Sequence, residues 1–150
     1  MSEHQPLEDN PPPPGATRET ALEVARQAMA GTLMERLGME WLDIGTARVV
    51  ARMPVEGNTQ VYGQLHGGAT AALCESVGSI GTAVVAGLDK RVVGIDISVH
   101  HLKAVRDGSI TATGIPLRVG RSVAVWDMRV EDDGGDLVAV GRLTVAIREG

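Results

Sequence analysis

One long helix-like segment followed by four strand-like segments constrains the fold of this chain more than any other feature. Within residues 67–86, Leu73, Val77, Ile80 and Val84 recur at i, i+4, i+7 and i+11, the spacing of one apolar helix face. The strand-like segments follow at about 91–103, 108–118, 121–131 and 137–148. Consecutive strands pair with one another, and one helix can cover one face of their sheet. We therefore predict an α+β fold, with a long antiparallel sheet wrapped against a central helix.

The residues before that helix predict a further helix and one early strand. Thr20 and Glu23 have the spacing of a capping box, and apolar residues with helical periodicity continue to Leu37. Residues 41–55 read as a strand, and residues 58–65 read as a loop. Residues 1–16 are polar and rich in proline, so we expect a disordered tail. Residues 17–150 then form a single domain.

Composition excludes several classes of partner. The net charge of −5 argues against a nucleic-acid surface, which needs concentrated basic side chains. The N-terminus lacks the basic and then apolar layout of a signal peptide, and no apolar run looks long enough to span a bilayer. We therefore expect a cytoplasmic protein that binds neither nucleic acid nor membrane.

The cysteine and histidine pattern predicts no metal site. Cys74 is the only cysteine, so no intrachain disulfide can form, and we expect a buried, inert thiol. His100 and His101 are neighbours on a strand and therefore lie on opposite faces. His101 shares its face with Val99, which indicates a core histidine with its hydrogen bonds satisfied.

A solitary carboxylate is the first functional signal. No lysine or arginine occurs between Arg52 and Lys90, so this segment offers Glu75 no basic partner. Because burying an unpaired charge is costly, Glu75 either faces water or has a function. Its helix face carries Ser79 and other small residues, a composition that suits cover by another protein surface.

The second signal is His66-Gly67-Gly68 at the start of the helix. The first N–H groups of a helix have no intrahelical partner, and the helix dipole adds partial positive charge there. Glycine lets a ligand approach the backbone closely. Such a site can stabilise the oxygen that becomes negative in acyl transfer. The alternative is a simple joint between loop and helix, with Glu75 an ordinary solvated residue.

Together these residues resemble a hotdog-fold acyl-CoA thioesterase, closest to the branch that hydrolyses aromatic CoA esters such as 4-hydroxybenzoyl-CoA and 1,4-dihydroxy-2-naphthoyl-CoA. The resemblance covers roughly residues 41–147. It is carried, in order, by residues 65–68 and 75–79, residues 92–97 leading to His101, and residues 116–117 with Gly120 and Trp126. It implies the hotdog fold, in which a long sheet wraps around one helix.

The resemblance also implies roles for individual residues. The backbone N–H of Gly67 polarises the thioester carbonyl, with Gln60 and His66 beside it. Glu75 acts as nucleophile or general base, and Ser79 orients the attacking water. The residues at positions that contact the CoA phosphates in the family are Lys103, Arg121, Ser122 and, more weakly, Arg106.

The family further implies a homodimer with sites between its subunits, usually paired into a homotetramer. It implies no metal, and no cofactor apart from the CoA that is part of the acyl-CoA substrate. Two alternatives remain at this point. One is a hotdog dehydratase or hydratase, although the Asp-x-Asn-Pro-x-x-His pattern of those enzymes is absent. The other is a non-catalytic module that binds acyl-CoA.

Overall fold

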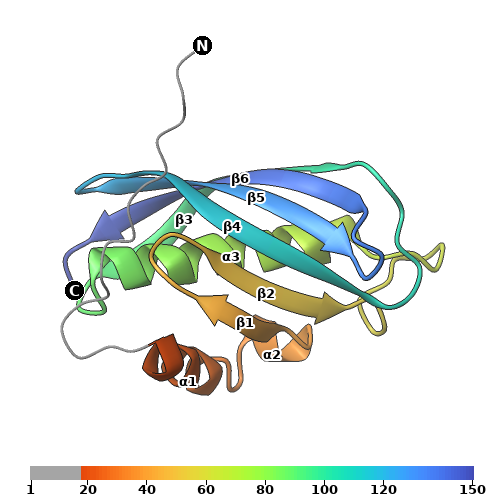
Figure 1. Cartoon of the computed structure of the whole chain (residues 1–150), viewed down its shortest axis with the longest axis horizontal. Helices are drawn as coiled ribbons and strands as arrows, with labels where there is room; N and C mark the ends of the chain where they lie inside the picture. Colours follow the sequence, from red (N-terminus) through yellow and green to blue (C-terminus); the bar gives the residue numbers. More distant parts are fainter. Residues whose placement is uncertain (1–17) are drawn as a thin grey trace, which may run out of the picture.

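The computed structural model describes residues 18–150, so the expected tail over residues 1–16 lies outside the described part of the chain. Three helices and six strands follow one another along it (Figure 1). In chain order these are α1 (Arg18–Ala28), α2 (Leu33–Arg36), β1 (Glu40–Ile44), β2 (Val49–Pro54), α3 (Gly67–Ala86), β3 (Arg91–His101), β4 (Ser109–Val119), β5 (Val123–Asp132) and β6 (Leu137–Arg148).

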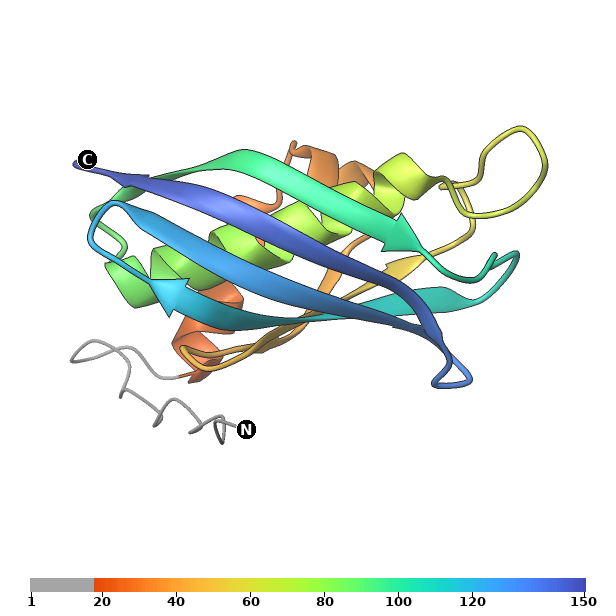
Figure 2. The ribbon, with the colours of Figure 1, turned by 90° about the horizontal axis from the view of Figure 1, so that it is seen from above.

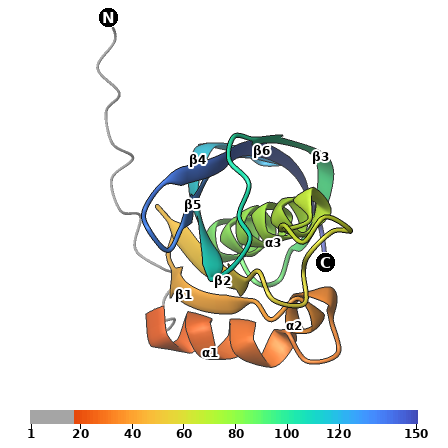
Figure 3. The same ribbon diagram turned by 90° about the vertical axis from the view of Figure 1, so that its right-hand side faces the viewer.

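The strands form one six-stranded sheet in the order β1-β2-β4-β5-β6-β3, with every pair antiparallel. Seen from above, α3 runs beneath the long strands (Figure 2). Seen from the end, the sheet curls around α3, while α1 packs outside β1 (Figure 3). The α+β architecture predicted from the sequence is therefore confirmed, and β3 lies at one edge of the sheet.

The N-terminal third differs from its prediction in two places. The single helix expected up to Leu37 is broken into α1 and α2, because Gly31 between them adopts φ +74°, a left-handed conformation that no helix interior allows. The single strand expected over residues 41–55 is two strands, because Gly45 N–H donates to Arg48 O across a tight turn at 2.9 Å. Both predictions missed a turn inside an otherwise periodic segment.

Helix α3 packs closely on the sheet because it carries glycine where the sheet comes nearest. A Cβ added at Gly81 would overlap the ring of Trp126, which is fully buried. The Trp126 indole N–H donates to Thr82 Oγ1 at 2.8 Å, which satisfies the ring in the core. These glycines weaken the helix locally but let a large aromatic side chain reach its surface.

By length and hydropathy, α3 is also a helix that could cross a membrane, so the expectation that no apolar run is long enough is wrong. Its surroundings are those of a core helix, however. Leu73 and Val77 are fully buried against the inner face of the sheet, and Ile80 and Val84 are partly buried there. This arrangement is typical of the central helix of a soluble domain.

Candidate active site

The start of α3 has one backbone donor without a partner. His66 is the N-cap, and its Nδ1 accepts a hydrogen bond from Gly68 N–H at 2.8 Å. The carbonyl of His66 accepts from Ala69 N–H at 3.0 Å and from Thr70 N–H at 3.3 Å. Within residues 18–150, Gly67 N–H makes no hydrogen bond. One open N–H therefore lies at the positive end of a 20-residue helix.

The cap also fixes how His66 presents its other nitrogen. Because Nδ1 accepts a hydrogen bond, it carries no proton, and the proton of the neutral ring is on Nε2. The His66 side chain is exposed, so its Nε2–H is available as a donor beside the helix start. His66 therefore stabilises the helix with one nitrogen and leaves the other for a ligand.

Gln60 lies on the loop that leads into α3, and hydrogen bonds hold this loop. Gln60 N–H donates to Gln64 O at 2.8 Å, and the side-chain oxygen of Gln60 accepts from Tyr62 N–H. Arg106 donates to Tyr62 O at 3.1 Å from the next loop. Because its amide oxygen is engaged, Gln60 has its NH2 group left to donate.

A cavity of about 330 Å³ opens beside this helix start. Its walls include Gln60, Gly67 and Lys103, three of the site residues expected from the sequence. Thr70 and His101 also line it, and neither had been assigned to the site. The cavity thus joins the loop before α3, the first turn of α3 and the segment after β3.

The interpretation of His101 as a satisfied core histidine is wrong. His101 is exposed, and within the described residues its side chain makes no hydrogen bond. A Cβ built on Gly67 would lie 2.7 Å from His101 Nε2, so the ring rests directly on that glycine. Strand alternation correctly put His101 on the helix side of β3. The sequence could not show that β3 ends level with the first turn of α3, where the core gives way to the cavity.

Glu75 lies on a different part of the helix. Its side chain is exposed and forms no hydrogen bond or ion pair with residues 18–150. The carboxylate rests against β3, where a Cβ on Gly94 would be 2.6 Å from Glu75 Oε1. Ser79, one turn further along α3, is half-buried. Thr82, further along α3, is fully buried, and its Oγ1 accepts a hydrogen bond from the Trp126 indole N–H.

One chain does not bring Glu75 to Gly67. Eight positions separate them on α3, which is about 12 Å along the helix axis at 1.5 Å per residue. A glutamate side chain is too short to span that gap. The structure therefore brings together Gln60, His66, Gly67 and His101 in one group and places Glu75 with Ser79 in another.

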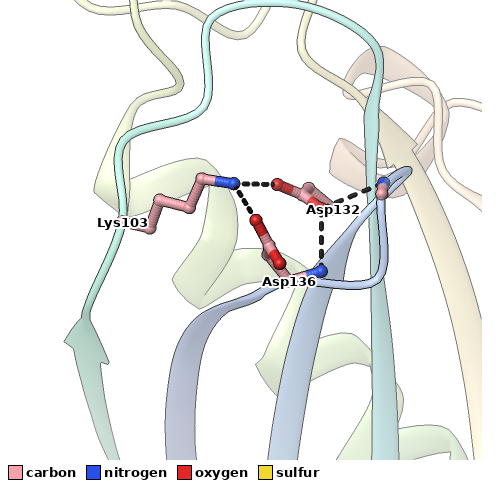
Figure 4. A network of polar contacts seen from close by, with 4 residues as sticks. Lys103, Asp132 and Asp136 are labelled. Carbon is pink, nitrogen blue, oxygen red and sulfur yellow. Dashed lines mark hydrogen bonds and ion pairs between the residues drawn. The ribbon is translucent and has the colours of Figure 1, made fainter.

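Lys103 is engaged by the turn between β5 and β6 (Figure 4). Its Nζ lies 2.8 Å from Asp132 Oδ2 and 2.5 Å from Asp136 Oδ2. Hydrogen bonds to these carboxylates raise the pKa of Lys103 to about 12. The hydrogen bond from Lys103 also lowers the pKa of Asp132. The contacts fasten the segment after β3 to this turn.

Arg121 and Ser122 lie in the turn between β4 and β5, at the other end of the sheet. Both are exposed, and the Arg121 side chain contacts no acidic group within the described residues. The length of β5 separates this turn from Asp132, which is about 30 Å at the usual rise per strand residue. The basic candidates of the sequence thus fall into two separate groups in one chain.

The Cys74 prediction is confirmed. Its side chain is fully buried, and desolvation raises the pKa of the thiol to about 12. A thiol with so little thiolate is a poor nucleophile. In residues 18–150, moreover, no three His, Cys, Asp or Glu side chains gather as a metal site would require.

Comparisons with known proteins agree with this architecture. The family model described as "Thioesterase superfamily" matches residues 62–139. The proofreading thioesterase EntH of Cronobacter turicensis is 37% identical over 131 residues, covering 87% of this chain and 96% of that protein. The 1,4-dihydroxy-2-naphthoyl-CoA hydrolase of Escherichia coli is 34% identical, with coverage of 87% and 96%.

Among solved structures, a thioesterase of Haemophilus influenzae superposes with a TM-score of 0.82 at 35% identity. The match covers 85% of this chain and 90% of that one. The likeness confirms the hotdog fold expected from the sequence.

Proposed function

The chain belongs to the thioesterase superfamily and is a thioester hydrolase, and from that premise we propose that it hydrolyses an acyl-CoA to the free acid and CoA. The observation that carries the proposal is the unpaired N–H of Gly67 at the start of α3. Because the start of the helix already holds this N–H in place, the protein need not rearrange when negative charge develops on the carbonyl oxygen. This is the electrostatic requirement of acyl transfer from a thioester.

The side chains around Gly67 add donors to the same place. In this proposal the thioester carbonyl oxygen accepts from Gly67 N–H, and His66 Nε2–H and the Gln60 amide position the thioester beside it. Their hydrogen bonds to the loop and helix leave those donors free. Because His66 Nδ1 is used by the cap, His66 serves as a donor and not as a base.

Glu75 supplies the nucleophile or the general base. As nucleophile, its oxygen attacks the carbonyl carbon, the C–S bond breaks with release of CoA thiolate, and water then hydrolyses the mixed anhydride. As general base, Glu75 takes a proton from a water that attacks the carbonyl directly. Ser79 orients that water. Both routes give the acid and CoA, and neither needs a metal or a further cofactor.

The separation along α3 supports an active site built from two chains. Because Glu75 and Gly67 lie about 12 Å apart on one helix, the Glu75 that serves a given Gly67 comes from a second copy. β3 is an edge strand of the sheet, and it exposes Val93 (55%) and Ile95 (58%) on either side of Gly94. A long apolar edge strand is a ready surface for pairing with another chain. We propose a homodimer through β3 as the minimal unit, with two dimers forming a homotetramer.

Such a dimer also supports a role for Arg121 and Ser122. Antiparallel pairing of two β3 strands about a two-fold axis puts the Arg91 end of one beside the His101 end of the other. The turn with Arg121 lies at the Arg91 end, because Ile147 N–H donates to Ser122 O and Ile147 pairs with Val92. In this arrangement Arg121 and Ser122 bind the CoA phosphates of the partner's site. Lys103 and Arg106 already hold other groups, so in this proposal Lys103 serves as part of the cavity wall and Arg106 holds the loop before α3.

For the acyl group we propose an aromatic or medium-length chain. The relative in Escherichia coli is named for an aromatic CoA ester, which supports the aromatic choice. A single buried, unpaired cysteine suits a reducing compartment, which supports a cytoplasmic location.

The test is release of free thiol from benzoyl, phenylacetyl, naphthoyl and straight-chain CoA esters. We expect the wild type to turn over at least one of them and Glu75→Gln to lose several orders of magnitude of kcat, because the amide can neither attack nor take a proton. Glu56→Gln, in the exposed loop after β2, is the matched control and should match the wild type. Tight binding of these esters without thiol release would instead indicate a binding module.

A further inference from the structure

The contact between His101 and Gly67 places a second imidazole at the helix start. Nε2 is the ring atom nearest to Gly67, at 2.7 Å from the position of an added Cβ, whereas Cε1 and Cδ2 lie at 3.2 and 3.3 Å. Its approach explains the glycine in steric terms, since any side chain at position 67 would collide with the ring. The same glycine carries the open N–H.

These two groups are close enough to share one ligand atom. The added Cβ is two bonds of about 1.5 Å each from Gly67 N, so His101 Nε2 lies within about 6 Å of that nitrogen. Hydrogen bonds to oxygen are about 2.7–3.2 Å long between heavy atoms. A single oxygen can therefore accept from both nitrogens at normal lengths. Both residues line the same cavity, which gives that oxygen room.

The backbone of His101 is held firmly while its ring has no other partner. His101 pairs with Ala139 of β6, and Leu102 N–H donates to Val138 O at 2.8 Å immediately beyond it. In residues 18–150 no group accepts from or donates to the ring. A fixed backbone and an uncommitted, exposed ring are what a ligand-binding histidine requires.

We propose that His101 is a further catalytic residue of the thioesterase, whose Nε2–H donates to the carbonyl oxygen that also accepts from Gly67 N–H. As the carbonyl carbon becomes tetrahedral, that oxygen gains negative charge and both hydrogen bonds strengthen. No proton needs to leave His101 in this step. The inference rests on the proposed acyl-CoA hydrolysis and adds a side-chain donor to its backbone donor.

Three substitutions of His101 separate donation from packing. His101→Ala should lower kcat by about 10²–10³-fold, the usual effect of removing one such donor. His101→Gln keeps an N–H donor of similar reach and should retain more kcat than His101→Leu, which fills similar space without donating. The matched control is His100→Ala. His100 lies on the opposite face of β3 with Ser98 Oγ 3.2 Å from its Nε2, and its loss should leave kcat unchanged.

The outcomes are distinct. If His101→Ala keeps kcat within about twofold of the wild type, or if the Leu and Gln variants are equally active, the ring only packs beside Gly67 and the inference is overturned. Far-UV circular dichroism and thermal unfolding of each variant show whether a loss of kcat reflects lost structure, and a variant that keeps the fold but loses kcat supports donation. If the wild-type protein releases no thiol from any CoA ester, the proposed function itself is contradicted.

Discussion

The two ends of the long sheet treat their basic side chains differently. At the end beside the start of α3, Lys103 is held by Asp132 and Asp136, and Arg106 donates to Tyr62 O. At the other end, the Arg121 side chain lies exposed in its turn with no acidic partner in the described residues. At the first end, hydrogen bonds already engage the basic side chains beside the cavity. At the second end, the side chain of Arg121 is exposed and forms no ion pair within the described residues.

This difference teaches that a basic residue near a proposed site need not bind the ligand. Charge that is already neutralised by two carboxylates has little attraction left for a phosphate. The unpaired charge of Arg121 lies about 30 Å away in the same chain, so it can contact a phosphate at this site only when a second copy of the chain brings it close. We therefore assign the chemistry to the helix start of one chain and the phosphate contacts to the far end of the other.

Substitution of His66, at the end of the sheet beside the start of α3, should have the largest effect. His66→Ala loses both the cap and the Nε2–H donor, so it should lower kcat about 10²-fold or more and destabilise the fold by about 1 kcal/mol. His66→Asn should keep stability, because asparagine caps helices well, yet lose kcat to a similar extent. Urea unfolding and thiol release measure the two effects. Full activity in the Asn variant would show that His66 is only a cap.

Substitution of Arg121, in the turn at the other end of the sheet, should have a smaller effect. Arg121→Met should raise KM for acyl-CoA several-fold and leave kcat unchanged, because the phosphates take no part in the bond changes. The same variant should treat an acyl-pantetheine, which lacks the nucleotide, like the wild type. Arg129→Met is the control, since Arg129 is already paired with Glu131 at 2.8 Å. An equal rise in KM for acyl-CoA and acyl-pantetheine would show that Arg121 does not act through the CoA phosphates.

The smallest expected effect is the pH dependence of the Lys103 contacts. Asp132 has a lowered pKa, so its contribution to stability is present above its ordinary value of 3.8 and is lost as the pH falls through the folded value. Lys103 has a raised pKa, so its contribution is present below its ordinary 10.5 and is lost as the pH rises through about 12. The contacts therefore stabilise the fold between these limits. Lys103 and Asp136 are exposed to solvent, which screens their charges, so the effect is modest.

Urea unfolding of the wild type and Lys103→Met across this range measures that window. The difference in free energy of unfolding should be constant near neutral pH and shrink toward both extremes. A difference that does not change with pH would show that Lys103 acts through packing alone.

Much of the fold was predictable because it depends on local pattern. Apolar residues at helical spacing predicted α3, and strand-like segments separated by turn residues predicted β3 to β6. The breaks at Gly31 and Gly45 were missed, because one glycine in a periodic segment does not reveal its own backbone angles.

The site was predictable in part for the same reason. The start of α3 followed from His66-Gly67-Gly68, which are adjacent in the sequence. The contact of His101 with Gly67 was not predictable, because it depends on where β3 ends beside a helix that begins 34 positions earlier. The pairing of Lys103 with Asp132 and Asp136 is likewise a long-range contact between two turns.

The central claim, that Glu75 of one chain serves Gly67 of another, is tested most directly by mixing two inactive variants. Glu75→Gln and His66→Ala chains, co-expressed with different tags, should form mixed dimers with one intact site each. Random pairing would then restore about a quarter of the wild-type activity per chain, since half the dimers are mixed and each has one working site. If purified mixed dimers stay as inactive as either parent, Glu75 and His66 belong to the same chain's site and the account is contradicted.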